Sequence, residues 1–157
     1  MTKIIVSDIS SPAINGCSYI YAPKGQALEY SELASNPYSG CGHKCAYCYV
    51  PKALRMKSRE SFDSIAVERP NYRSGLMRDA IKYDKTKTEA QVMLSFTTDP
   101  YHPFDTSATQ YALEVIGSTH GLGFCTLTKG GTRALRDIHL FRRNKDAFAT
   151  TLTSLDD

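Results

Sequence analysis

The stretch Gln91-Val-Met-Leu-Ser-Phe-Thr97 is a compact apolar run in the middle of the chain. A short apolar run of this kind is typical of a strand that is buried on both faces of a parallel sheet. It follows the segment 73–85, in which Leu76, Ala80 and Ile81 recur at roughly helical spacing. A helix followed by a buried strand is the repeating unit of α/β proteins, so this stretch indicates the fold class.

The alternation of helix and strand continues on both sides of this stretch. In chain order, we predict a strand at 33–38, a helix at 73–85, a strand at 91–97, a helix at 107–118, a strand at 124–127, a helix at 132–143 and a strand at 147–152. Pro37 interrupts the first of these strands, because proline lacks the N–H group that a strand ladder uses. Short strands alternating with helices favour an α/β fold built on a parallel sheet.

The chain ahead of this alternation has a different character. Residues 1–29 contain several Pro and Gly residues without sustained periodicity, which predicts an irregular N-terminal extension before a domain at 30–157. Within the extension, the apolar residues Ile4, Ile5 and Val6 would suit an edge strand. The connection at 49–71 is long for an α/β unit, and we expect it to lie near the functional site because long loops often carry function.

Length and composition are those of an ordinary soluble protein. The chain has 157 residues, of which 41% are hydrophobic and 22% charged, as in globular domains and unlike disordered or fibrous chains. No stretch approaches the roughly 18 apolar residues that span a bilayer, and residues 1–10 have no long apolar segment after a basic start, as a secretory signal would. We therefore expect a cytoplasmic protein with no membrane segment.

Three of the five cysteines are clustered in one short segment. Cys41, Cys45 and Cys48 lie in Ser39-Gly-Cys-Gly-His-Lys-Cys-Ala-Tyr-Cys-Tyr-Val-Pro51, with the spacing C-x3-C-x2-C. A disulfide framework is not expected, since the cytoplasm keeps thiols reduced. Three thiolates within eight residues can converge on one metal centre without help from distant parts of the fold.

Two kinds of metal centre are compatible with this spacing. Structural zinc usually takes four ligands, and His43 is poorly placed as the fourth because it lies between two of the cysteines. A [4Fe-4S] cluster fits better, since three thiolates bind three irons and the fourth iron stays open for another ligand. Gly40 and Gly42 would let the backbone curl around such a cluster and aim N–H groups at its sulfurs. Zinc remains the alternative to a [4Fe-4S] cluster at these cysteines.

Positive charge is concentrated around the same segment. Between Cys41 and Arg59 the chain has no Asp or Glu, although its net charge is only +3. The basic residues of this run are Lys44, Lys52, Arg55, Lys57 and Arg59. Such a run favours an anionic ligand or partner, and the alternative is a solvated face of a loop or short helix.

The cysteine segment resembles the radical S-adenosylmethionine (SAM) superfamily. The hallmark of that superfamily is Cys-x3-Cys-x-aromatic-Cys after the first strand, and Tyr47 is the aromatic residue here. The wider string Asn36-Pro-Tyr-Ser-Gly-Cys-Gly-His-Lys-Cys-Ala-Tyr-Cys-Tyr49 is similar to the subgroup related to spore photoproduct lyase, often labelled DNA repair photolyase. The resemblance runs from about Leu33 to the end of the chain, through Thr97-Thr-Asp-Pro-Tyr101, Leu127-Thr-Lys-Gly130 and Thr151-Leu-Thr-Ser-Leu-Asp-Asp157.

The resemblance implies a fold, two cofactors and a reaction. The fold is a partial (β/α)6 barrel with about four of the six βα units. The cofactors are a [4Fe-4S] cluster and SAM, whose reductive cleavage gives a 5′-deoxyadenosyl radical that abstracts hydrogen from a substrate. We therefore expect a lyase-like radical SAM enzyme, with nucleic acid as a substrate that the basic run would suit. Phe96 stands where spore photoproduct lyase carries its hydrogen-donating cysteine, so the likeness leaves the product open.

The same resemblance assigns the site residues. Cys41, Cys45 and Cys48 are the expected ligands of the cluster. The expected SAM contacts lie in the cysteine segment and at the ends of three strands: Tyr47, Thr97, Thr98, Asp99, Lys129, Thr153 and Ser154. Residues 97–99 stand where the superfamily contacts the SAM amine, Lys129 is similar to a lysine that holds the SAM carboxylate, and residues 153 and 154 stand where the ribose is contacted. The ends of parallel strands are where α/β barrels place their active sites.

Partners follow from the same likeness. A radical SAM enzyme needs an electron donor of the flavodoxin or ferredoxin type. Since only about four βα units are present, we expect a C-terminally truncated member whose open barrel edge is covered by a second chain. The alternative is a truncated, non-catalytic module that holds a cluster or zinc without completing a SAM site.

Overall fold

A four-stranded sheet forms the centre of the molecule. The computed structural model describes residues 18–152. The strands of the sheet are β1 (Leu33–Ser35), β4 (Ala90–Leu94), β5 (Leu122–Thr128) and β6 (Ala147–Thr150), in the order β1-β4-β5-β6. All three neighbouring pairs are parallel, with Val92 opposite both Leu33 and Phe124. The predicted α/β class with a parallel sheet is therefore confirmed.

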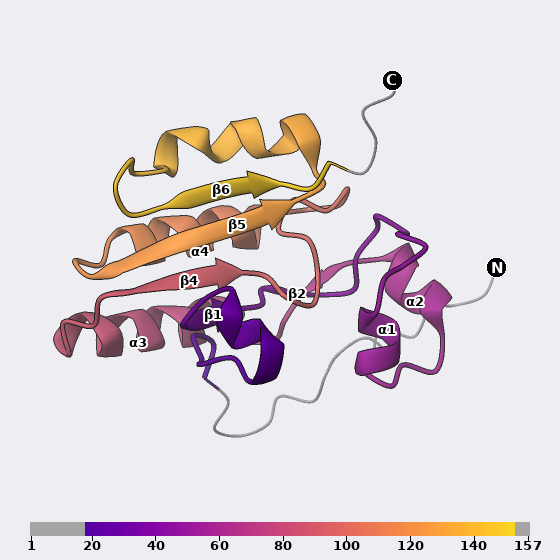
Figure 1. The fold of residues 1–157 in the computed structure, drawn as a ribbon, viewed down its shortest axis with the longest axis horizontal. Helices are drawn as coiled ribbons and strands as arrows, with labels where there is room; N and C mark the ends of the chain where they lie inside the picture. Colours follow the sequence, from indigo (N-terminus) through magenta and orange to yellow (C-terminus); the bar gives the residue numbers. More distant parts are fainter. Residues whose placement is uncertain (1–17, 153–157) are drawn as a thin grey trace.

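Helices follow the strands as the apolar periodicity predicts. They are α3 (Tyr72–Lys85), α4 (Ser107–Gly117) and the 3-10 helix η3 (Gly131–Leu140). Figure 1 shows α3 and α4 behind the sheet. Their apolar side chains Leu76, Leu113 and Ile116 form one buried cluster with Leu94 and Phe124 of the sheet. The main core therefore lies on one face, while the pocket described below opens on the other.

The first predicted strand is too long. The structure ends β1 at Ser35, and Tyr38–Ser39 forms a separate strand, β2, that pairs antiparallel with β3 (Val67–Glu68). Pro37 between them has no N–H group to donate to the ladder, which accounts for the break. The predicted strand at 91–97 also ends early, at Leu94. The N–H groups of Phe96 and Thr97 donate to the side chain of Asn36 and not to a neighbouring strand.

The predicted helix at 132–143 is a 3-10 helix that ends at Leu140. Arg142 lies outside this helix. Oδ2 of Asp146 accepts hydrogen bonds from Nε of Arg142 at 2.8 Å and from its backbone nitrogen at 2.7 Å. The same guanidinium donates to the carbonyls of Gly117 and Leu122 at 2.8 and 2.9 Å. This side chain therefore joins the end of α4 to the start of β5.

The remaining elements lie around the ends of the strands. Residues 49–71 contain α1 (Val50–Ala53) and α2 (Arg59–Ser64), which lie on the side to which the arrowheads of β4, β5 and β6 point (Figure 1). The predicted extension contains the 3-10 helix η2 (Gly25–Glu29), and Tyr21 forms an isolated bridge with Ala34. The edge strand predicted at Ile4–Val6 lies outside the described residues. Within residues 18–152, no helix is both long and apolar enough to cross a membrane.

Candidate functional site

The three clustered cysteines line a single pocket at the carboxyl ends of the strands. We call residues 41–48 the cysteine loop. Cys41, Cys45 and Cys48 are free thiols, each half-buried, and all face a pocket of about 610 Å³. The loop is shaped by hydrogen bonds from the N–H of Cys48 to the carbonyl of Cys45 (3.0 Å) and from the N–H of Cys41 to the carbonyl of Phe62 (2.8 Å). The structure thus brings the predicted ligand residues to one place.

Gly40 fixes the entry of the chain into this loop. Its φ is +87°, in the left-handed region that favours glycine, and a Cβ atom there would collide with the backbone oxygen of Ile65. A side chain at Gly42 would likewise collide with Pro103 and Phe104. The expectation that these two glycines let the backbone curl is consistent with this geometry.

Arg59 of α2 holds the loop from outside. Its guanidinium donates to the carbonyls of Cys45 and Ala46, the latter at 3.3 Å, and pairs with Asp63 at 3.0 Å. This member of the basic run is therefore a structural residue, and sequence reasoning missed that role. The other four, Lys44, Lys52, Arg55 and Lys57, are exposed.

The predicted residues after β4 line the same pocket. Thr97, Thr98 and Asp99 all face it. The hydroxyl of Thr98 donates to the carbonyl of Gly40 at 2.5 Å, and the side-chain oxygen of buried Asn36 accepts from the backbone nitrogens of Phe96 (2.8 Å) and Thr97 (3.2 Å). Asn36 therefore joins the end of β1 to the segment after β4, and Thr98 joins that segment to Gly40, next to the cysteine loop.

The carboxylate of Asp99 is buried and already well supplied with donors. Oδ1 accepts from the backbone nitrogen of Tyr101 (2.7 Å) and the hydroxyl of Thr128 (2.5 Å), and Oδ2 accepts from the backbone nitrogen of Lys129 (2.7 Å). His43 Nε2 lies 3.3 Å from Oδ2. Burial alone would raise the pKa of Asp99, but these contacts outweigh it and the pKa is lowered, so the group is ionised at neutral pH.

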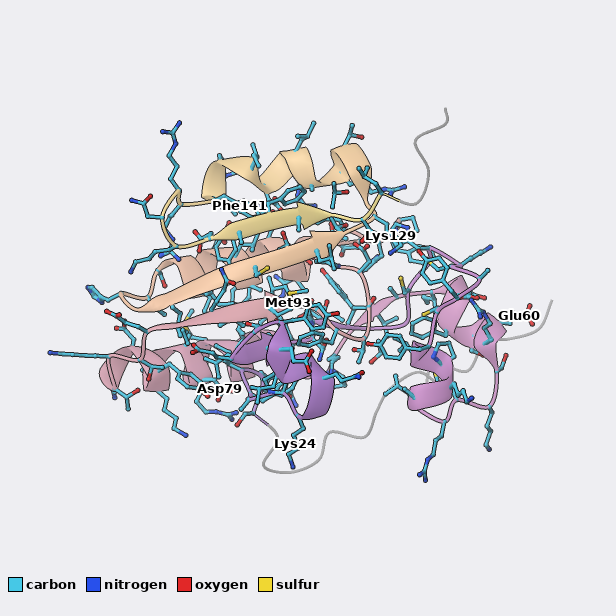
Figure 2. The ribbon with its side chains drawn as sticks, in the orientation of Figure 1. Lys24, Glu60, Asp79, Met93, Lys129 and Phe141 are labelled. Atoms are coloured by element: carbon cyan, nitrogen blue, oxygen red, sulfur yellow. The ribbon has the colours of Figure 1, made fainter. Side chains whose placement is uncertain are left out.

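Lys129 and Tyr47 meet at the rim of the pocket. The ammonium of Lys129 lies 5.6 Å from the centre of the Tyr47 ring, within the range of a cation–π contact. Figure 2 shows Lys129 at the arrowhead end of the sheet, on the side of the segment that carries Glu60. Both predicted residues line the pocket, whereas Thr153 and Ser154 lie outside the described residues.

Uncharged side chains line another part of the pocket. Met93 of β4 and Leu127 of β5 come from the sheet, and Tyr30 comes from the segment after η2. Ser95 also lines this part, and its hydroxyl has no hydrogen-bond partner in the described part of the chain. Sequence reasoning did not find these residues, because their apolar or small side chains carry no signal of a site.

Zinc and a [4Fe-4S] cluster need different spacings of the cysteine sulfurs. Zinc in a tetrahedral thiolate site needs its sulfurs roughly 4 Å apart, and within residues 18–152 no three His, Cys, Asp or Glu side chains are close enough to hold one ion. A [4Fe-4S] cluster spreads three cysteines over three irons, so its ligands stand further apart. Burial raises the pKa of Cys41, partly offset by the N–H groups of His43 and Asp99, so metal binding there would release a proton.

Comparisons with protein-family models, curated proteins and solved structures gave no match to this chain. Function is therefore inferred from the residues of the pocket and from their chemistry. Three thiols, an ionised carboxylate and a lysine ammonium share one cavity with apolar walls. Such a cavity can hold a metal centre beside an organic ligand that carries a carboxylate.

Proposed function

We propose that this chain is a radical SAM iron–sulfur protein of the lyase-like type. It binds a [4Fe-4S] cluster through Cys41, Cys45 and Cys48, and SAM in the adjoining pocket. When bound and reduced, these cofactors supply a 5′-deoxyadenosyl radical for hydrogen abstraction. The observation that carries the proposal is that a C-x3-C-x2-C set of free thiols lines one pocket at the carboxyl ends of parallel strands.

The chain's own residues bind and orient the ligand. The ammonium of Lys129 attracts the carboxylate of the methionyl group, and Thr97 and Thr98 offer oxygen acceptors to its amine. Tyr47 offers an aromatic face, and Met93 and Leu127 add apolar surface to the pocket. Thr153 and Ser154 stay proposed ribose contacts.

The proposed fold is a partial (β/α)6 barrel. Four parallel strands in the order β1-β4-β5-β6, with α3 and α4 on one face, support it. In a barrel of this kind the other face of the sheet points inward, and this is the face on which Met93 and Leu127 line the pocket.

The partners in this proposal are anionic. A flavodoxin- or ferredoxin-type protein supplies the electron, and nucleic acid is the proposed substrate. Exposed Lys44, Lys52, Arg55 and Lys57 beside the cysteine loop support an anionic partner, because none of them forms an ion pair within residues 18–152. Binding of a single-stranded oligonucleotide that weakens as salt is raised would support nucleic acid.

The test is anaerobic reconstitution of the full chain with iron and sulfide. We expect about four irons per chain, the broad visible absorbance of a cubane, and 5′-deoxyadenosine on addition of SAM and a reductant. Replacing Cys45 with Ala should lower the bound iron about tenfold or more, since a cluster left with two thiolate ligands loses its anchoring.

Cys125 provides a matched control. It is also a free, half-buried thiol, but it lies on β5 and not among the pocket residues. Cys125→Ala should keep the iron content and the 5′-deoxyadenosine yield. A colourless protein that binds zinc and no cluster would instead identify the chain as a non-catalytic metal-binding module.

A further inference from the structure

The carboxylate of Asp99 connects three loops that are far apart in the sequence. Asp99 itself follows β4, its Oδ2 accepts from the backbone nitrogen of Lys129 after β5, and the same oxygen lies 3.3 Å from His43 Nε2 in the cysteine loop. A carboxylate has about four acceptor positions. With Thr128 and Tyr101 on Oδ1, all of them face groups of the chain itself.

His43 has a physical reason to keep this contact. Its Nε2 atom is buried and has no hydrogen-bond partner in residues 18–152. A buried donor without a partner costs free energy, and a small rotation of the ring would direct its N–H at Asp99 Oδ2. The nearby carboxylate therefore favours one position of His43 and, with it, of the cysteine loop.

Lys129 is held at both ends by groups linked to that loop. Its backbone nitrogen donates to the oxygen that faces His43, and its ammonium lies over the ring of Tyr47. His43 and Tyr47 both belong to the cysteine loop, and the Lys129 ammonium forms no ion pair among the described residues. A shift of the loop would therefore move both ends of Lys129.

We propose that His43 is a positioning residue: acting through Asp99, it fixes Lys129 relative to the cysteine loop. Ordering the cysteine loop then orders Lys129, and by reciprocity holding Lys129 orders the loop. The identity of the Lys129 ligand as the SAM carboxylate rests on the proposed function, but the coupling between the two loops does not.

Amide hydrogen exchange on the metal-free full chain tests this coupling directly. His43→Leu removes the ring donor, and we expect the Lys129 amide to exchange about tenfold faster. His43→Gln keeps an N–H donor near the same place and should retain the protection. The matched control is His120→Leu, because His120 Nδ1 also lies near a carboxylate, 3.1 Å from Asp84 Oδ1, but on the exposed surface.

The proposal is overturned if His43→Leu leaves exchange at Lys129 unchanged. It is also overturned if the Phe124 amide, which donates to Asp146 in the middle of the fold, accelerates equally, because the effect would then be general loss of stability. If His43→Leu does not fold, Lys129→Met gives an independent answer. By reciprocity it should speed exchange at the Cys48 amide, and an unchanged rate there overturns the proposal.

A second measurement uses the reconstituted protein. His43→Leu should bind as much iron as the unmodified chain, because all three cysteines remain, yet bind SAM about tenfold more weakly, as read from the change in the cluster's electron paramagnetic resonance signal. Combining it with Lys129→Met should add little further loss, and full additivity overturns the coupling. If the unmodified chain takes up no cluster, the proposed function fails while the exchange result still decides the coupling.

Discussion

His102 is a buried imidazole beside the site that the proposed chemistry does not use. It is fully buried, its ring lies 4.4 Å from the Tyr38 ring in an edge-to-face arrangement, and its Nδ1 accepts from the backbone nitrogen of Phe104 at 3.2 Å. Burial lowers the pKa of His102 to about 4, although the charge of Asp99 acts in the opposite direction. The ring is therefore neutral at pH 7 and contributes to packing.

This histidine should make the protein sensitive to mild acid. An unfolded histidine takes up a proton near pH 6.5, whereas folded His102 does so only near pH 4. The unfolded state therefore binds more protons between these values, and stability falls as the pH falls through that window, by about 3 kcal/mol in total. His102→Phe should remove most of this slope. Urea unfolding at several pH values between 4 and 7 measures how the free energy of unfolding changes with pH.

A matched control separates this effect from that of other groups. His120→Gln changes an exposed histidine and should leave the slope as it is. The carboxyls of Asp99, Asp105 and Asp146 have lowered pKa values, so they titrate below the window. If the free energy of unfolding changed equally with pH in His102→Phe and in the unmodified chain, His102 would not be the source of the acid sensitivity.

Elements were predictable from the sequence where periodicity was the signal. The helices at 72–85 and 107–117 lie within one residue of their predicted bounds, because apolar spacing reports which face is buried. The ends of the strands were not predictable in this way, because side chains such as that of Asn36 form hydrogen bonds with the backbone groups there. The cysteines and the strand-end positions of Asp99 and Lys129 could be foreseen, but the contact of His43 with Asp99 depends on how the loops fold onto each other.

Two glycines test how strictly the path of the cysteine loop is determined. Gly40 and Gly25 both have positive φ, of +87° and +63°, but a Cβ atom at Gly40 would collide with Ile65 whereas Gly25 has no atom within 4 Å. Gly25→Ala should cost only backbone strain, about 1 kcal/mol. Gly40→Ala should cost about 3 kcal/mol or more, because strain and a collision with the backbone add.

The two variants should also differ in metal binding. Gly40 precedes Cys41 directly and its carbonyl accepts from Thr98, so a displaced backbone there moves the first cysteine. We expect Gly40→Ala to lower iron uptake during reconstitution and Gly25→Ala to leave it unchanged. Urea unfolding and iron analysis of the same samples give both results, and equal behaviour of the two variants would show that the collision is relieved at no cost.

At the scale of the molecule, the sheet has an open side. β6 is the last strand in the order β1-β4-β5-β6 and, within residues 18–152, pairs only with β5 (Figure 1). Its residues Phe148 to Thr150 are exposed and carry no charge. Phe148 of β6 and Leu152, two residues after this strand, are exposed apolar side chains. An uncharged strand edge with apolar surroundings is a template for pairing with another chain.

We therefore expect the isolated chain to associate through β6 as its concentration rises. Ala149→Lys places a charge on this edge strand and should lower the association constant about tenfold, because a lysine on an edge strand disfavours pairing with another chain. Leu28→Lys is the control, since Leu28 is a similarly exposed apolar residue on η2, away from β6. Sedimentation velocity over a range of concentrations measures both. A chain that stays monomeric throughout, or one that responds equally to both substitutions, would exclude the β6 edge as a contact between copies of the chain.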